Sequence, residues 1–133
     1  LPTHTQTEQA TLAHASPRDP TWEYIFSKEQ VADAFDRSCH DLILVGHTHV
    51  ATHFSISETK EWGLAPEGTN LLLDRPRLLN PGSIGQPRDG DPRAAWLLID
   101  IANKVATFKL NVCKIRLRTH LDADPSHHSL EVP

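Results

Sequence analysis

The chain has 133 residues and a formal net charge of −4, from 13 basic and 17 acidic side chains. This length is typical of one domain that can bury most of its apolar surface, and the acidic balance argues against an electrostatic nucleic-acid-binding surface. No apolar stretch approaches the ~20 residues of a membrane span, and no charged-then-apolar leader resembles a signal peptide.

The numbers of cysteines and methionines bear on the cellular location of the protein and on whether the chain is part of a longer one. The two cysteines, Cys39 and Cys113, have a spacing that does not require them to pair, and so few cysteines favour a reduced, cytoplasmic setting. Methionine is absent, even at residue 1. Since a natural reading frame begins with methionine, we expect that residue 1 is not the native start and that the chain is a piece of something longer.

Two helices are predicted in the N-terminal third of the chain. Asp19 followed by proline is typical of a helix N-cap with proline at the first helical position, which predicts a short helix over residues 22–25. Ser27 and Gln30 have the spacing of a capping box, so a second helix is expected to begin there and to end near Ser38. Its apolar residues recur at helical spacing and give it one apolar face.

Strands account for most of the remaining structure. One strand follows the second helix directly, as in an α/β unit, whereas residues 1–9 are predicted to be a loop and residues 58–69 a loop or hairpin connection. The predicted strands cover Ala10–Ala13, Asp41–Val45, Val50–Ser57, Leu71–Leu73, Arg77–Leu79, Ala94–Ile101 and Val105–Arg118. The last strand changes phase after Val112, which requires a bulge or a change of sheet. We expect residues 1–118 to form the folded unit and residues 119–133 to be a flexible tail.

The most informative motif is Gly46-His47-Thr48-His49, which directly follows an apolar run. That run is apolar on both faces, which indicates a buried strand and argues against the alternative that the histidines are ordinary surface residues. In an extended chain, residues two apart point to the same side, about 6–7 Å apart, so His47 and His49 are expected to face one pocket while Thr48 faces away. Gly46 lets the backbone bend and a ligand come close. Because imidazole binds zinc, iron, manganese, nickel or copper and open α/β sheets place their sites at strand ends, the motif predicts a metal site.

Three phrases in this order, LAHASPRDPTWEYIF, LILVGHTHV and LLNPGSIGQPRDGDPRAAWLLID, resemble the calcineurin-like metallophosphoesterases, with the closest likeness to their small bacterial and archaeal phosphodiesterase branch. The resemblance covers residues 10–118. It implies the α/β fold of a four-layer α/β/β/α sandwich, with a two-metal site at which a bridging hydroxide attacks the phosphorus of a phosphoester. By that likeness His14 and His47 bind one divalent ion and His49 binds the other, with manganese as the foremost metal and iron, zinc and nickel as alternatives.

Part of the family's ligand set has no counterpart in this chain. In that family the other metal ligands, and the histidine thought to protonate the leaving group, come from an earlier Asp-x-His pair, an Asp in a Gly-Asp phrase and an Asn followed by His. The chain has no Asp-x-His and no Asn-His, and its one Gly-Asp lies in a later loop. We therefore expect the C-terminal half of the sandwich, mostly strands with one or two helices, whose partner is the missing N-terminal half. The isolated chain is expected to be inactive or weakly active.

One loop and one arginine are the candidates for binding the phosphoester substrate. Asn80, Gly82 and Ser83 belong to a loop rich in turn residues, which could be a simple turn or could line the site with backbone N–H groups facing a phosphate. Arg88 could bind a phosphate bidentately or pair with a neighbouring aspartate.

Two other functions stay open on the sequence alone. One is a non-catalytic interaction scaffold of the same fold, against which the retention of three histidines argues. The other is an unrelated small α/β domain with one three-histidine metal site. Metal content distinguishes them, since two ions per complete protein support the esterase, one ion supports the isolated site and no ion supports the scaffold. Cyclic nucleotides, nucleotide diesters, dinucleoside polyphosphates and phosphoproteins all fit a two-metal cleft.

Overall fold

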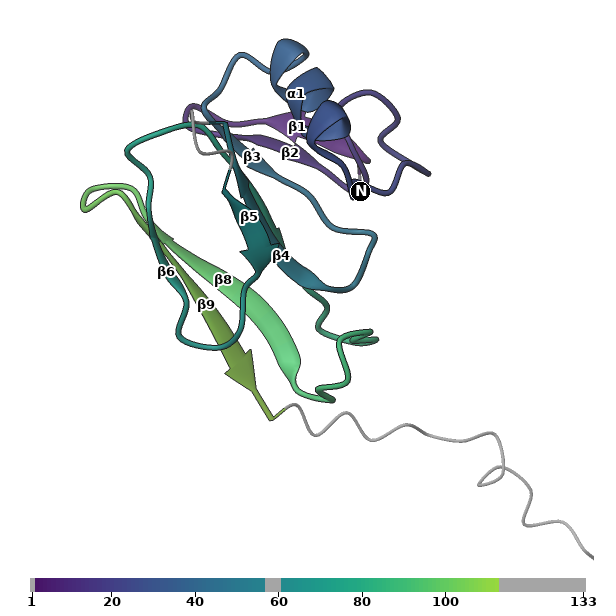
Figure 1. Cartoon of the computed structure of the whole chain (residues 1–133), viewed down its shortest axis with the longest axis vertical. Coiled ribbons are helices and arrows are strands. Elements are labelled where there is room, and N and C mark those ends of the chain that lie inside the picture. Colours follow the sequence, from purple (N-terminus) through teal and green to yellow (C-terminus); the bar gives the residue numbers. More distant parts are fainter. Residues whose placement is uncertain (1, 57–60, 113–133) are drawn as a thin grey trace, which may run out of the picture.

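The computed structural model describes residues 2–56 and 61–112, which form two β-sheets and one α-helix (Figure 1). Sheet A has its strands in the spatial order β1 (His4–Gln6), β2 (Thr11–Ala13), β3 (Leu42–Leu44), β7 (Arg77–Pro81), β4 (Ala51–Ser55) and β5 (Trp62–Leu64). Sheet B has the order β6 (Asn70–Leu72), β9 (Val105–Asn111) and β8 (Ala94–Asp100). The helix, α1 (Lys28–Asp36), follows β2 in the chain.

The centre of sheet A is parallel, and this places the ends of three strands at one edge. Leu12 of β2 lies opposite Leu44 of β3, and Ile43 of β3 lies opposite Leu78 of β7, in parallel register. On the two flanks, β1, β4 and β5 pair antiparallel. The carboxyl ends of β2, β3 and β7 therefore meet at one edge, which is where open α/β sheets place their sites.

The helix covers one face of sheet A (Figure 1). Its N-terminus has the predicted capping box, since the Ser27 hydroxyl accepts from the Gln30 N–H (3.2 Å) and the Gln30 side chain accepts from the Ser27 N–H (3.1 Å). The helix ends at its C-cap, Arg37, close to the predicted end. Val31 and Ala34 are buried in one hydrophobic cluster with residues of β3, β4 and β7, so the amphipathic pattern of the helix forms this layer of the core.

Sheet B covers the other face of sheet A. Ala106 and Phe108, two residues apart on β9, are buried together with Leu42 and Leu79 of sheet A. The layers therefore run helix, sheet A, sheet B, which are three layers of the predicted α/β/β/α sandwich. The described chain is mostly strand, so the predicted fold class is confirmed.

The predicted short helix over residues 22–25 is wrong. Asp19 does act as a cap, but its carboxylate accepts the N–H groups of Thr21 and Trp22 (3.1 Å each) in a turn, and the chain then runs on without helical structure. Tertiary contacts override the local signal. Ile25 is buried in the helix-side cluster, and the Glu23 carboxylate is held by hydrogen bonds from neighbouring side chains.

Two short strands lie in segments for which the sequence predicts no strand: β1 lies in the predicted loop over residues 1–9, and β5 lies in the predicted loop or hairpin connection over residues 58–69. β1 pairs with β2 through His4 opposite Ala13, and β5 forms a hairpin with β4. Strands of three residues are too short to show alternation, which explains why the pattern did not predict them. The predicted phase change after Val112 and the predicted tail over residues 119–133 lie outside the described residues. Within the part of the chain that is described, no helix is long and apolar enough to cross a membrane.

Candidate metal centre

Three histidines follow the ends of two parallel strands of sheet A. His14 comes directly after β2, and His47 and His49 come shortly after β3. The Gly46 N–H donates to the His14 carbonyl (3.0 Å), which ties the two strand ends together. The ring centroids of His14 and His47 lie 4.8 Å apart in an edge-to-face arrangement. The structure thus brings together the histidines that the sequence singles out.

The backbone around the motif is not extended as predicted, although His47 and His49 line one cavity. His47 and His49 have φ angles of 66° and 61°, and the Thr48 N–H donates to the Gly46 carbonyl (2.7 Å) across His47. A positive φ with this hydrogen bond is the geometry of a strained γ-turn. Thr48 is buried and does not line the cavity that contains His47 and His49. Non-glycine residues at positive φ are uncommon and cluster at functional sites, where the surrounding structure holds them.

Asn80, at the end of β7, holds this turn in place. Its side chain is 1% exposed, and its amide nitrogen donates to the Gly46 carbonyl (2.7 Å) and to the Thr48 hydroxyl (2.9 Å). Its carbonyl oxygen accepts from the Gly82 N–H (3.0 Å). These three bonds join the turn after β3 to the loop after β7. The sequence predicts Asn80 to bind substrate, and the contacts add a positioning function that sequence patterns do not reveal.

One cavity of about 540 Å³ contains all three histidines in its lining, at the carboxyl edge of sheet A. Gly82 and Ser83 line it as well, whereas its remaining wall is mainly apolar and comes from β2, β3 and β8. The polar groups of the cavity are therefore concentrated at the strand ends, as is usual in a ligand site with a few convergent polar groups.

Two imidazole nitrogens of residues that line this cavity have no hydrogen-bond partner within the described residues, as is also the case for one ring nitrogen each of His4 and His53 elsewhere. Nε2 of His47 and Nδ1 of His49 are buried and accept or donate no hydrogen bond within the described residues. The backbone of Trp22 hydrogen-bonds with the His47 ring, and since Nε2 has no partner, we assign this bond to Nδ1–H. That assignment leaves the lone pair of Nε2 free. Buried polar atoms without partners are costly, and a histidine whose other nitrogen donates to a carbonyl is typical of a metal ligand.

The electrostatic environment keeps His47 neutral. Burial is the main cause that lowers the pKa of His47 below its usual 6.5, and the nearby charges of His14, His49 and Arg88 lower it further. The hydrogen bond with the Trp22 backbone partly opposes this shift. Because a metal binds the neutral imidazole, a lowered pKa means less competition from protons at neutral pH.

The donors present fit a metal, but they do not complete a site. Among residues 2–56 and 61–112, no three His, Cys, Asp or Glu side chains are grouped so that they could hold a metal ion. The isolated three-histidine site considered as an alternative is therefore not formed by the described chain.

Sequence reasoning missed one aromatic residue of the site. The Tyr24 ring stacks on the His47 ring, with centroids 4.2 Å apart and planes 29° apart, and Phe26 stacks on Tyr24 at 5.7 Å. The only signal in the sequence was the recurrence of aromatic residues at positions 22, 24 and 26, which was assigned in part to a helix. In an extended segment that spacing places side chains on one side.

The remaining candidate residues are placed as follows. Gly82 has a φ of 93°, and a Cβ there would lie 2.9 Å from the Ala95 Cβ, so the loop passes close to β8. The Ser83 carbonyl accepts from the Ala95 N–H (2.9 Å). Arg88 is exposed, and its N–H donates to the His49 carbonyl (3.1 Å). The described residues include no ion pair of Arg88, whereas Arg93 pairs with two carboxylates.

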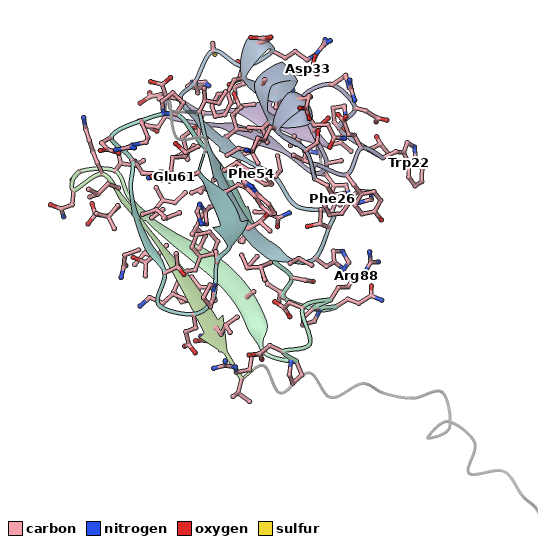
Figure 2. All side chains as sticks on the ribbon, in the orientation of Figure 1. Trp22, Phe26, Asp33, Phe54, Glu61 and Arg88 are labelled. Carbon is pink, nitrogen blue, oxygen red and sulfur yellow. The ribbon has the colours of Figure 1, made fainter. Side chains whose placement is uncertain are left out.

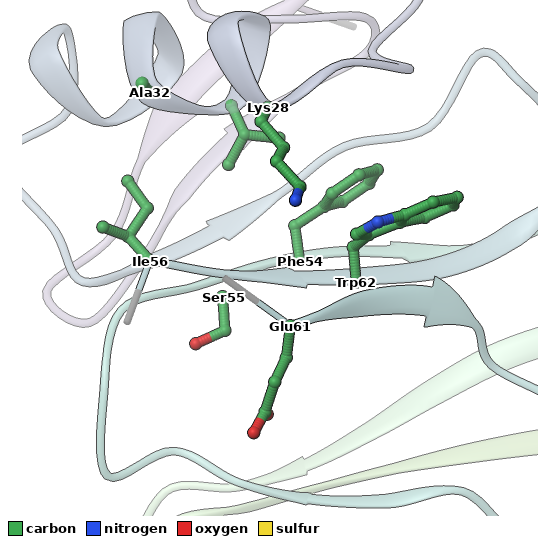
Figure 3. A pocket seen from close by; sticks show the side chains of 8 residues that line it. Lys28, Ala32, Phe54, Ser55, Ile56, Glu61 and Trp62 are labelled. Carbon is green, nitrogen blue, oxygen red and sulfur yellow. The ribbon is translucent and has the colours of Figure 1, made fainter. Parts of the chain in front are cut away.

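A second hollow lies between α1 and the β4–β5 hairpin (Figure 3). It measures about 170 Å³ and is lined mainly by apolar side chains, among them Phe54 and Trp62, with Lys28 and Glu61 as its charged groups. It contains no histidine, and its lining shares no residue with that of the histidine cavity. The chemistry of the molecule therefore centres on the histidine cavity.

The chain is similar to proteins of one family. The family model of the calcineurin-like phosphoesterase superfamily domain matches residues 3–104. An uncharacterized protein of Methanocaldococcus jannaschii is 36% identical over 109 residues, which cover 81% of this chain and 41% of that protein. The crystal structure of a metallophosphoesterase from Sphaerobacter thermophilus matches with a TM-score of 0.78 and 34% identity, over 84% of this chain and 48% of that one. The chain thus spans less than half the length of each relative.

Proposed function

Because the chain belongs to the calcineurin-like phosphoesterase superfamily, we propose that the protein hydrolyses phosphoesters, phosphodiesters foremost, at a site of two divalent ions. This chain would supply the histidine-rich part of that site. The observation that carries the proposal is the pair of buried nitrogens, Nε2 of His47 and Nδ1 of His49, that have no partner in the described chain and belong to residues lining one cavity with His14.

The histidines divide between the two ions. In this proposal His14 and His47 hold one ion, because their rings are in contact, and His49 holds the other. Manganese is the first choice, and iron, zinc and nickel also suit imidazole ligands. When bound, two divalent ions supply charge neutralisation at the phosphate oxygens and a water of lowered pKa.

The chain's own residues orient this site. In this proposal the Trp22 backbone hydrogen-bonds with the His47 ring and helps to orient it, and Asn80 fixes the turn that carries His47 and His49. The N–H of Gly82 and the amide of Asn80 are already bonded within the protein. Ser83, which lines the cavity, and Arg88, which has no ion pair in the described chain, are therefore the foremost substrate contacts among the predicted residues.

Further ligands must come from outside the described residues. Three imidazoles do not balance the charge of two divalent ions, and carboxylates usually do so in two-metal sites. We expect these ligands, and the acid that protonates the leaving group, from an N-terminal half of the same fold. The cytoplasmic location predicted from the scarcity of cysteine belongs to the same proposal.

Metal content and turnover test the proposal together. The purified protein is stripped with a chelator and reloaded with Mn²⁺, and both the bound metal and the hydrolysis of bis(4-nitrophenyl) phosphate are measured. We expect metal-dependent turnover and two bound ions per complete protein. Absence of both metal and turnover would instead favour the scaffold function. The 133-residue chain alone should show little or no turnover, and robust turnover by it would contradict the division of the site.

A further inference from the structure

Three aromatic side chains lie in one short segment, and one of them, Tyr24, contacts the ring of the cavity residue His47. Trp22, Tyr24 and Phe26 alternate with Glu23 and Ile25. Ile25 is buried in the core, and Glu23 accepts hydrogen bonds from neighbouring side chains. These two intervening residues are anchored in the protein, whereas the side chains of Trp22 and Phe26 are exposed.

The aromatic rings continue the stack that begins at His47. Tyr24 lies 4.2 Å from the His47 ring, and Phe26 lies 5.7 Å from Tyr24 with planes only 6° apart. Exposure rises along the row, since Tyr24 is 38% exposed, Phe26 68% and Trp22 73%. Flat apolar faces are thus presented to solvent two ring spacings from the histidines. Exposed apolar groups gathered at a cavity rim mark binding surfaces more often than scattered ones do.

A cation lies on the same flank. Figure 2 shows Trp22, Phe26 and Arg88 along one side of the molecule. The backbone of Arg88 is bonded to His49, and its charge contributes to the lowered pKa of His47. A guanidinium beside a phosphate-binding cavity can pair with a phosphate oxygen. The flank therefore combines an anion-attracting group with flat hydrophobic faces.

We propose that Trp22 and Phe26 form a stacking surface for the base of a nucleotide whose phosphate lies at the histidine cavity. Tyr24, which contacts both Phe26 and His47, is a positioning residue between this surface and the cavity. This inference rests on the proposed phosphoesterase function and narrows its substrate class. Of the phosphoesters that fit a two-metal cleft, the nucleotides carry the flat ring that these faces recognise, whereas a phosphoserine or phosphothreonine side chain carries none. Base stacking on aromatic side chains tolerates any base, because every base has a π-face.

Direct binding tests the stacking surface without requiring turnover. The affinities of adenosine 5′-monophosphate and of ribose 5-phosphate, which lacks the base, are measured by calorimetry on the purified protein at constant Mn²⁺. We expect the nucleotide to bind at least about tenfold more tightly, in line with the contribution of one stacked base. Equal affinities, or no measurable binding of the nucleotide, would overturn the inference.

Matched variants assign the preference to the two exposed rings. Phe26→Leu and Trp22→Leu keep an apolar side chain but remove the π-face, so each should reduce the preference for the nucleotide several-fold and leave the affinity for ribose 5-phosphate unchanged. Phe26→Tyr keeps an aromatic ring at this position, so it should keep the preference for the nucleotide. If the loss in Phe26→Leu came only from damage to the fold, a ring at this position would not be what decides the preference. Trp62→Leu is the control. Trp62 lies on β5, lines the other hollow and is about equally exposed (61%), so its replacement should leave the preference for the nucleotide unchanged. A preference that survives in both Leu variants overturns the assignment.

The two proposals fail by different measurements. Hydrolysis of bis(4-nitrophenyl) phosphate requires the metal centre, and its absence contradicts the proposed function whatever the affinities are. Metal-dependent hydrolysis together with equal binding of the two ribose phosphates contradicts only the stacking surface.

Discussion

Two polar clusters in this molecule are the histidine cluster, made of His14, His47 and His49, and the ion-pair cluster, made of Arg93, Asp91 and Glu67. In the ion-pair cluster the guanidinium donates to one carboxylate at 2.6 Å and to the other at 2.7 Å. Arg93 also lowers the pKa of Asp91 to about 2. In the histidine cluster, two buried nitrogens find no partner in the described chain, and two residues have strained backbones. One cluster is satisfied by its own side chains, and the other leaves two ring nitrogens without a partner in the described chain.

This difference separates stability from function. The ion-pair cluster is exposed to solvent, which screens its charges, and an exposed pair of this kind contributes little to stability. The histidine cluster combines buried unpaired atoms with positive φ angles, each of which disfavours folding. Such features persist where the surrounding structure holds them for a function. Substitutions in the two clusters should therefore affect different measurements.

The largest effect is expected from the histidine cluster. In the full-length protein, His47→Ala and His49→Ala should each lower the hydrolysis of a model phosphodiester by several orders of magnitude, about 10³-fold or more, because a metal ligand is lost. The unfolding free energy of the metal-free protein should change by no more than about 1.5 kcal/mol, the value of one aromatic contact. Initial rates at saturating Mn²⁺ and urea unfolding measure the two quantities.

His40 provides the control for these variants. It lies away from the cavity, where its ring contacts the Thr11 hydroxyl at 3.0 Å, so His40→Ala should keep hydrolysis within a few-fold of the wild-type rate. Near wild-type turnover of His47→Ala or of His49→Ala would contradict the assignment of that histidine to the metal centre.

The second effect concerns the loop that passes close to β8. Gly82→Ala adds a Cβ at a φ of 93° and 2.9 Å from the Ala95 Cβ, so it should lower the free energy of unfolding by about 2–4 kcal/mol. Gly90→Ala is the matched control, because Gly90 has a similar φ of 89° and no atom lies within 4 Å of the Cβ that the substitution adds. It should cost only about 1–2 kcal/mol, from the backbone alone. Equal losses in urea unfolding would show that the close approach to Ala95 does not matter.

The third effect comes from the residue that clamps the histidine turn. Asn80→Ala leaves the Gly46 carbonyl and the Thr48 hydroxyl without their buried donor and should destabilise the protein by about 2 kcal/mol. Asn80→Asp keeps the size of the side chain but lacks the N–H groups, so it should be at least as harmful. Urea unfolding measures both variants. A loss below about 0.5 kcal/mol in each would mean that the clamp is not needed.

The smallest effect is expected from the ion-pair cluster. Because the pKa of Asp91 is lowered from 3.8 to about 2, the pair contributes stability above pH 3.8 that is lost as the pH falls toward 2. Arg93→Ala should therefore leave hydrolysis unchanged and make the loss of stability over that pH range slightly shallower. Unfolding by urea at several pH values in this range measures the slope. A steeper slope in the variant would contradict the assigned direction.

Local patterns in the sequence were sufficient for helix α1 and for the histidines that line one cavity. The Ser27–Gln30 capping box and the buried strand before Gly46 each depend on neighbours within a few residues, so they could be predicted from spacing alone. The order of the strand ends likewise follows from the parallel arrangement of an α/β unit. For these reasons the sequence determined the fold class and the histidines that line one cavity.

Only the tertiary structure decided how those histidines are held. The positive φ of His47, the clamp by Asn80 and the stacking of Tyr24 all depend on residues distant in the chain. The predicted helix over residues 22–25 was wrong for the same reason, since burial of a distant core residue outweighed a local cap. Long-range packing and buried hydrogen bonds outweigh local preferences of about 1 kcal/mol per residue. These long-range contacts cannot be predicted from the spacing of residues in the sequence.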